Sequence, residues 1–311
     1  MAEPRHDKLF YYTLLPFAST SLAIVLLLAS ILAVNSLPAI ERYGLSLLTR
    51  NVWSPVELDP EASDYGLLAP LLGTLVTATI ATMASIPIAA SLVYVSEEVL
   101  PARMSRVRSA ISILVDVMAG MPTIVYGLWG ALVLAPLLLN YVYQPLNKYF
   151  GFIPLFACSP YTGLNILTAS LLLSIMITPF VFAVVRESYT QIPLSYREAS
   201  LSLGTTKYEH FRIMLGIIKP SLIAGALLGF GRAASETVAV TLVVGNAFNL
   251  PYCLLSPGYT VSALIANQFN NAPLYPYMES VLLFSGAILL LLGLVSNLAG
   301  LIMLSRVKAR V

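Results

Sequence analysis

Long apolar runs alternate with shorter polar segments along this chain. Six of the runs are long enough to cross the hydrocarbon core of a bilayer, which takes about 20 residues of helix. The polar segments between them hold nearly all of the charged residues. The pattern predicts an all-α integral membrane protein with six transmembrane helices, over approximately residues 11–34, 67–95, 109–139, 163–185, 220–245 and 276–304.

Composition agrees with this class. Hydrophobic residues make up 58% of the 311 residues and charged residues 10%, whereas a soluble domain has about 45–50% apolar and about 25% charged residues. Four charged residues fall inside the expected spans. Each needs a partner or water, because a charge at the centre of a bilayer is costly. They are Asp116, Arg232, Glu236 and Glu279.

The distribution of Lys and Arg predicts the orientation. An even number of spans puts both termini on one side, and that side carries thirteen cations against three on the other. Cations favour the cytoplasmic side, so we expect both termini and the segment 186–219 in the cytoplasm, and 35–66, 140–162 and 246–275 outside. The net charge of +2 then reflects topology, and we do not expect nucleic-acid binding. The thirteen are Arg5, Lys8, Arg103, Arg106, Arg108, Arg186, Arg197, Lys207, Arg212, Lys219, Arg306, Lys308 and Arg310.

The first apolar run is expected to stay in the protein. It is longer than the 7–15 residue core of a secretory signal peptide and lacks a small-residue cleavage site before Glu41. The external segment after it is acidic and proline-rich, as solvated loops are. We therefore expect an appended N-terminal helix and loop (1–66), a five-helix core (67–304) and a short cytoplasmic tail (305–311).

Candidate catalytic chemistry is scarce. The two histidines, His6 and His210, lie on polar segments without the Cys or carboxylate spacing of a metal site. No lysine follows a glycine, so the chain has no Gly-Lys-Ser/Thr loop for nucleotide phosphates. We expect no catalytic residue, metal or cofactor in this chain; if ATP drives it, a separate subunit must hydrolyse the ATP.

The segment 186–219 is amphipathic and too polar to span a membrane. It predicts two short helices, Leu194–Leu203 and Thr206–Met214, joined at Gly204, because glycine adopts a positive φ without a Cβ penalty. With Glu198-Ala199-Ser200 before Gly204, it resembles the EAA loop of ABC import permeases, which docks into a cleft of the ATPase. The resemblance gives Glu198, Ala199 and Gly204 a role in ATPase coupling. An ordinary amphipathic hairpin at the membrane interface is the alternative.

Two further segments narrow the family. Residues 119–136 (AGMPTIVYGLWGALVLAP) and 229–246 (GFGRAASETVAVTLVVGN) resemble the matching stretches of phosphate permeases of the PstC type. The resemblance covers roughly residues 67–304 and implies a type I ABC importer fold that forms a translocation pathway by alternating access. The Arg-x-x-x-Glu pattern also occurs in sulfate and molybdate permeases, so a permease for sulfate, molybdate or tungstate is the nearest alternative.

The resemblance also implies an assembly in the cell membrane: a heterodimer with a second, PstA-like permease, two ATPase subunits and an external phosphate-binding protein. A different class of function, the ion-coupled secondary transporter, is less favoured. Such transporters carry paired repeats with broken helices around a midplane site, and no repeat stands out in this sequence.

Arg232 and Glu236 are the candidate residues of the substrate pathway. If the fifth span is one continuous helix, they lie one turn apart on the same face. Arg232 would then offset the negative charge of phosphate, and Glu236 would keep the hold weak enough for release. Alternatively, the two form a self-neutralising pair that only permits insertion. Asp116 is expected either to pair with an arginine on the cytoplasmic side or to gate, and Glu279 to reach water.

The two cysteines, Cys158 and Cys253, both fall in expected external segments. Disulfides persist in oxidising compartments outside the cytoplasm. We therefore hypothesise a Cys158–Cys253 disulfide, with two unrelated free thiols as the alternative.

Overall fold

The computed structural model describes residues 5–57, 59–100 and 104–308; Arg103 and Arg310, two of the cations used to predict the orientation, lie outside them. The described chain is almost entirely helical. A two-residue antiparallel pair, β1 (Trp53–Ser54) and β2 (Asp64–Tyr65), forms its sheet. The α-helices are α1 (Arg5–Tyr43), α2 (Ser46–Thr49), α3 (Leu68–Tyr94), α4 (Ser105–Gly120), α5 (Thr123–Trp129), α6 (Ala135–Leu138), α7 (Gln144–Phe150), α8 (Ile166–Thr190), α9 (Leu194–Ser202), α10 (Lys207–Ile217), α11 (Lys219–Ala234), α12 (Val238–Val243), α13 (Val261–Gln268) and α14 (Met278–Lys308).

Shorter helical turns extend several of these elements. Those that lie wholly within the described residues are π-helical at Val95–Val99, Gly130–Leu134 and Leu139–Tyr143, and 3₁₀ at Pro154–Phe156 and Phe269–Leu274.

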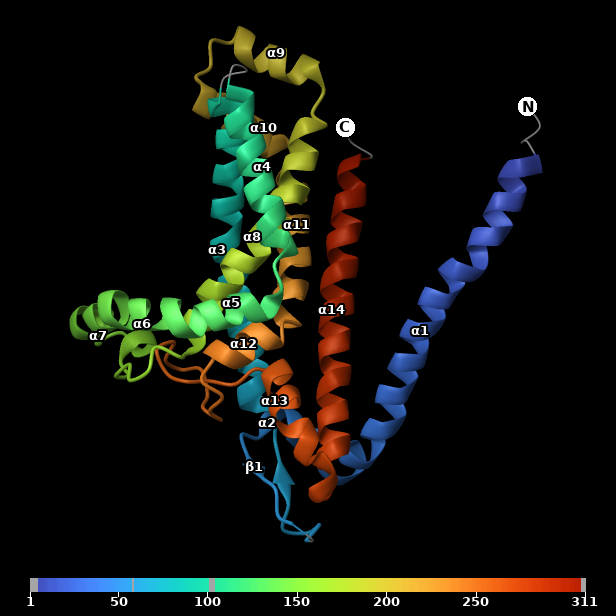
Figure 1. Ribbon diagram of the computed structural model, residues 1–311, viewed down its shortest axis with the longest axis vertical. Helices are drawn as coiled ribbons and strands as arrows, with labels where there is room; N and C mark the ends of the chain where they lie inside the picture. Colours follow the sequence, from blue (N-terminus) through green and yellow to red (C-terminus); the bar gives the residue numbers. More distant parts are fainter. Residues whose placement is uncertain (1–4, 58, 101–103, 309–311) are drawn as a thin grey trace.

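The long helices form an upright bundle. Helices α3, α4, α8 and α11 lie side by side, α14 stands against α11, and α5 to α7 form an arm that crosses the bundle (Figure 1). Helix α1 meets α14 near the sheet and leans away from it toward its own N-terminus (Figure 1). We call the end that carries α9 and α10 the elbow end, and the end that carries β1 and β2 the hairpin end. Helix α1 begins and α14 ends toward the elbow end.

Five helical stretches of the described chain are long and apolar enough to cross a membrane: Thr13–Tyr43, Leu68–Val99, Thr123–Phe150, Ile166–Thr190 and Met278–Ser305. Helices α10 and α11 pass the same test only together, and they are bent by 71°. The prediction of a helical membrane protein is confirmed, with five or six candidate crossings by length and composition.

The expected single span over 109–139 is wrong, because this segment does not form one helix. Helix α4 ends at Gly120, and Met121 is extended with ψ of 135° before α5 begins at Thr123. Pro122 explains the break, since the ring of a proline disfavours helical backbone in the residue before it. The chain changes direction there, so α4 stays in the bundle while α5 starts the crossing arm (Figure 1).

The prediction of one continuous helix over 220–245 is also wrong. Helix α11 ends at Ala234, and α12 begins only at Val238. The Glu236 N–H donates to the Ala233 carbonyl oxygen at 3.3 Å and not to that of Arg232, as a continuing helix would require. The Arg232 carbonyl oxygen accepts from the Ser235 hydroxyl at 3.2 Å instead. Arg232 is therefore in the last turn of α11.

The polar segment forms the predicted elbow between two short helices. Helix α9 ends one residue earlier than expected, and α10 starts one residue later and runs three residues further. Gly204 lies between them with φ of +74°, in the left-handed region that favours glycine. Helix α8 extends to Thr190, so the elbow, residues 194–217, starts later than the expected loop.

Close packing of α11 on α14 positions the last turn of α11. A Cβ atom added at Gly231 would lie 2.4 Å from the Ser296 Oγ of α14. Small residues allow such approach between membrane helices. The absence of a side chain at Gly231 therefore lets the backbone beside Arg232 pack closely against α14.

Candidate functional site

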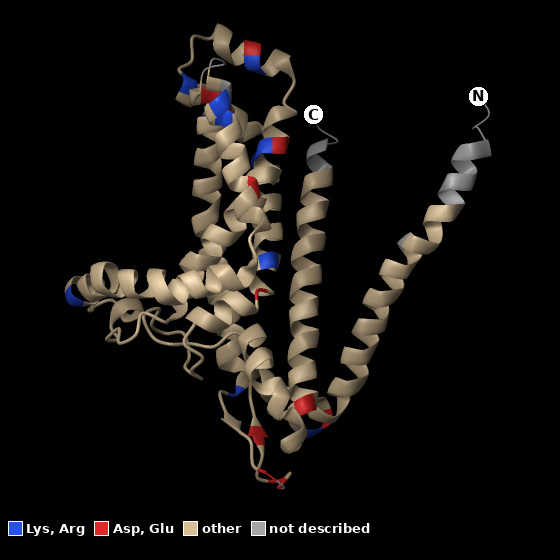
Figure 2. Cartoon of the chain, in the orientation of Figure 1, with Lys and Arg blue, Asp and Glu red and all other residues tan. Residues whose placement is uncertain are grey.

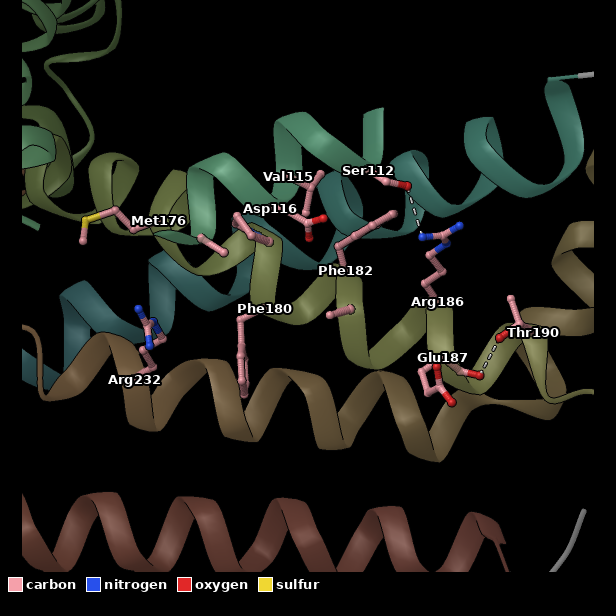
Figure 3. Close-up of a pocket in the computed structure, with 13 residues that line it drawn as sticks. Ser112, Val115, Asp116, Met176, Phe180, Phe182, Arg186, Glu187, Thr190 and Arg232 are labelled. Atoms are coloured by element: carbon pink, nitrogen blue, oxygen red, sulfur yellow. Dashed lines mark hydrogen bonds between the residues drawn. The ribbon is translucent and has the colours of Figure 1, made fainter. Parts of the chain in front are cut away.

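A cavity of about 550 Å³ opens among α4, α8 and α11 (Figure 3). Its apolar wall includes Met176, Phe180 and Phe182 of α8. The charged residues on it are Asp116 of α4, Arg186 and Glu187 of α8, and Arg232 of α11. The cavity thus brings together two of the four charges that the sequence placed inside the membrane.

Asp116 lies between the two arginines along the cavity in Figure 3, with Arg232 toward one end and Arg186 toward the other. Arg186 is the arginine nearer the elbow end, because it is in the last turns of α8. Its guanidinium donates to Glu97 Oε1 at 2.8 Å and to Ser112 Oγ at 3.2 Å. Among the described residues, the side chain of Arg232 has no hydrogen-bond or ion-pair partner.

Glu236 is not on the cavity wall described by these residues. Because α11 has ended, its carboxylate does not face Arg232 across one helical turn. Its Oε1 instead accepts from the Ala239 N–H at 3.4 Å, in the first turn of α12. The Glu236 carbonyl oxygen accepts from the Ser262 hydroxyl at 2.7 Å. The geometry assumed for the Arg232–Glu236 pair is therefore absent, whereas the role of each residue in transport stays a prediction.

The other two embedded acids are Asp116, which lacks an ion pair, and Glu279, which is exposed. Asp116 forms no ion pair within the described chain, so it is not paired with the arginine that we expected as one alternative. Glu279 is exposed on a separate cavity of about 380 Å³ near the start of α14, consistent with the expected access to water.

Two neighbouring carboxylates link α3, α8 and the elbow. Glu97 and Glu98 are on the π-helical turn after α3. Glu97 pairs with Arg186, and Glu98 Oε1 accepts from the Tyr189 hydroxyl at 2.6 Å and lies 3.8 Å from His210 Nε2 of α10. The Glu98 and His210 side chains are 14% and 4% exposed. This network, which we call the elbow junction, continues to the cavity through Arg186.

The elbow is fastened to the end of α8 but leaves its outer surface open. Arg197 donates to the Tyr189 carbonyl oxygen at 2.8 Å and stacks its guanidinium over the Tyr189 ring at 5.0 Å. Glu198 and Ala199 are exposed, and so are large apolar side chains on both helices. Exposed apolar residues at a polar end suit a protein interface. They include Leu194, Leu201, Leu203 and Tyr208.

A capping box begins α10. The Thr206 hydroxyl accepts from the Glu209 N–H, and the Glu209 carboxylate accepts from the Thr206 N–H at 2.8 Å. The hydrogen bonds from the Thr206 backbone and hydroxyl lower the pKa of the exposed Glu209 carboxyl below its ordinary value of 4.5. The start of α10 is thus defined by local hydrogen bonds and does not depend on burial.

Cys158 and Cys253 form a disulfide in the structure, with Cα atoms 6.2 Å apart, within the range that such a bond requires. The bond joins the segment after α7 to the segment after α12. A backbone hydrogen bond from Leu254 to Leu155, at 2.9 Å, runs beside it.

Sequence reasoning missed the elbow junction and the position of Arg186. Glu97-Glu98 follows the second span directly, and two adjacent carboxylates at a span end are a signal of a polar contact that we could have used. No sequence signal places Asp116 opposite Arg186 and Arg232, because the three residues come from different helices.

The chain is similar to known transport proteins. A family described as the binding-protein-dependent transport system inner membrane component matches residues 99–309. The probable phosphate transport system permease protein PstC of Methanocaldococcus jannaschii is 47% identical over 277 residues, 89% of this chain and 87% of that protein. The PstC proteins of Haemophilus influenzae and Xylella fastidiosa are 36% and 33% identical over 86% and 97% of this chain, and over 83% and 92% of their own lengths.

The helical crossings, the charged cavity and the elbow agree with this match. The chain therefore belongs to the family of binding-protein-dependent transport system inner membrane components.

Proposed function

We propose that this chain is the permease subunit of an ATP-driven phosphate importer and that the cavity among α4, α8 and α11 is part of its translocation pathway. The observation that carries the proposal is Arg232, a guanidinium without a side-chain partner in the described chain, on the wall of a cavity between crossing helices. Similarity to PstC proteins over most of the chain supports phosphate as the substrate.

Arg232 supplies the attraction for the anion. An arginine at this depth is costly unless it faces water or protein, and the cavity gives it access to water. Phosphate entering the cavity meets a positive potential that offsets the cost of leaving bulk solvent. Arg232 is exposed and unclamped, so it holds the anion loosely, as release during transport requires.

The elbow couples the permease to its ATPase. Glu198 and Ala199 on α9 and the turn at Gly204 form the docking surface, and ATP is bound and hydrolysed on a separate subunit. The complete importer contains this chain, a second similar permease, two ATPase subunits and an external phosphate-binding protein. The second permease closes the open side of the cavity, where Asp116 and Arg232 are exposed in the single chain.

The elbow end faces the cytoplasm in this proposal, with both termini on that side and the hairpin and the disulfide outside. Most of the Lys and Arg residues lie around the elbow end in Figure 2, together with several acidic residues, whereas few Lys or Arg residues lie at the hairpin end. This asymmetry is the one that orients membrane proteins.

A permease for sulfate, molybdate or tungstate is not favoured, because the curated relatives described above are phosphate permeases. The same fold and coupling would serve any of these anions, so the distinction depends on the pathway residues.

The test removes the cation. Arg232→Gln is expected to lower phosphate uptake by the reconstituted importer at least tenfold, since about 1.4 kcal/mol of lost attraction in the transport step is enough for that factor. Lys148→Gln removes the same charge from the exposed end of α7, away from the cavity, and should leave uptake near the wild-type rate. Assembly with the partner subunits is measured for both variants.

The double variant separates pathway from structure. If Arg232 and Glu236 only neutralise each other, Arg232→Gln/Glu236→Gln restores assembly and uptake together. An assembled double variant that remains inactive supports the pathway role. Recovery of phosphate uptake in the double variant contradicts it.

A further inference from the structure

Asp116 differs from the other acids around the cavity in having no partner. Glu187 Oε1 accepts from the Gln191 side chain at 2.6 Å, and Glu97 accepts from Arg186 at 2.8 Å. The Asp116 carboxylate accepts no hydrogen bond and forms no ion pair in the part of the chain that the structure describes. It is exposed on the cavity wall.

The position of this carboxylate is unexpected for an anion pathway. Along the cavity it lies between Arg232 of α11 and Arg186 of α8 (Figure 3), so in the proposed pathway an anion that moves from Arg232 toward the elbow end passes it. A fixed negative charge repels a passing anion, and like charges brought together at a binding surface are strongly unfavourable. A carboxylate at this point favours anion binding only if the anion donates a hydrogen bond to it.

A protonated oxyanion can donate such a hydrogen bond to the Asp116 carboxylate. An ionised carboxylate is a hydrogen-bond acceptor only, and a hydrogen bond from a hydroxyl to a carboxylate is short and strong. Inorganic phosphate carries one or two protons near neutral pH and can donate an O–H to Asp116 while its other oxygens accept from arginine. Sulfate carries no proton at that pH, so the same carboxylate only repels it.

We propose that Asp116 is a specificity-determining residue of the pathway: its carboxylate accepts a hydrogen bond from a protonated oxyanion held near Arg232 and disfavours oxyanions without a proton. Glu236 is less suited to this task, because its Oε1 caps α12 through the Ala239 N–H. The inference rests on the proposed function, since it requires that phosphate pass through this cavity.

The cavity offers a direct readout of anion binding. Ala183 lines it and is exposed, and the two native cysteines are bonded to each other, so Ala183→Cys adds a single free thiol. The rate at which a small methanethiosulfonate reagent modifies that thiol is measured in the assembled importer, in the absence of the external binding protein. Inorganic phosphate, arsenate and sulfate are added separately as protecting anions.

With Asp116 in place, phosphate and arsenate, which both carry a proton, are expected to slow modification at concentrations at least tenfold lower than sulfate. In Asp116→Asn the protecting concentrations of phosphate and sulfate should come within about threefold of each other, because the amide carries no charge to repel sulfate and offers it an N–H donor. Asp116→Glu keeps the acceptor and should recover most of the preference.

Glu187→Gln is the matched control, since Glu187 lines the same cavity but its carboxylate is already held by Gln191. It should keep the preference for phosphate over sulfate. An unchanged preference in Asp116→Asn overturns the specificity role and leaves the proposed function intact. Failure of every anion to protect Ala183→Cys, in an importer that still takes up phosphate, overturns the assignment of the cavity as the pathway and this inference with it.

Discussion

The carboxylates of the elbow junction and the Asp116 carboxylate of the cavity differ in burial and in hydrogen bonding. At the junction, Glu97 and Glu98 are mostly buried and each accepts a hydrogen bond from α8, one from Arg186 and the other from Tyr189. In the cavity, Asp116 is exposed and has no partner among the described residues. The two regions are joined by Arg186, which contacts Glu97 and also lines the cavity.

The difference teaches which charges serve stability and which serve transport. A partly buried carboxylate is tolerated when it is hydrogen-bonded, and removing it leaves donors without an acceptor. An exposed, unpaired carboxylate contributes little to stability and is free to meet a substrate. Stability and transport should therefore respond oppositely to substitutions in the two regions.

The largest stability effect is expected at Glu98. Glu98→Ala removes the acceptor of the Tyr189 hydroxyl and the neighbour of His210, and should destabilise the importer by roughly 2–4 kcal/mol. The measurement is the thermal unfolding of the purified complex. Glu57→Ala, at an exposed position of the hairpin loop, should change stability by less than about 0.5 kcal/mol.

Asp116→Ala tests the cavity in the same way. The complex that carries this variant should unfold at nearly the wild-type temperature, whereas its phosphate uptake should change. If Asp116→Ala destabilised the complex as much as Glu98→Ala, the distinction between the two regions would be lost.

A smaller effect is expected at Gly204, where it should appear in coupling more than in folding. Gly204→Val forces a β-branched residue to a φ of +74°, although the space around it is open, at a cost of about 1–2 kcal/mol. We expect the elbow to rearrange, so that less phosphate is transported per ATP hydrolysed. Transport at the wild-type ratio by a normally assembled variant would remove the turn from the coupling mechanism.

Gly216→Val is the control for Gly204→Val. Gly216 is in α10, with helical backbone and open space around it, so valine meets no backbone strain there and has a better helix propensity than glycine. Its ratio of transport to hydrolysis should stay close to that of the wild type.

The smallest effect is expected at Glu209. Its pKa is lowered in the folded protein, so the ionised carboxylate stabilises α10 above the unfolded value near 4.5, and this contribution disappears as the pH falls through the lower folded value. Glu209→Gln should therefore be less stable than the wild type at pH 7 and equal to it once the pH is below both values. A stability difference that grew toward acid pH would contradict this sign.

The helical membrane class and the elbow could be predicted because their signals are local. Apolar length identifies the crossings, and Gly204 between two amphipathic stretches identifies the turn. Pro122 was an equally local signal for the break after α4. It indicates an interruption of the span, but the apolar composition on both sides does not tell a kink from a full change of helix direction.

The arrangement at the cavity could not be predicted from sequence. Helical spacing placed Glu236 next to Arg232, but α11 ends between them, where the Ser235 hydroxyl replaces the Glu236 N–H as the donor to the Arg232 carbonyl oxygen. Asp116 and Arg186 line the same cavity as Arg232 only because of how α4, α8 and α11 pack together. Such proximity depends on which helices are neighbours, and the period of one helix contains no information about that.

The Cys158–Cys253 bond has a consequence for the integrity of the chain. The two cysteines are 95 positions apart in sequence, and their bond closes a covalent ring that contains α8, the elbow, α11 and α12. A protease that cuts once in the exposed elbow opens the ring but does not release a fragment. The nicked chain migrates as one species until a reductant is added and then separates into two, so Arg186 and Arg232 stay on tethered pieces even after the connection between them is cut.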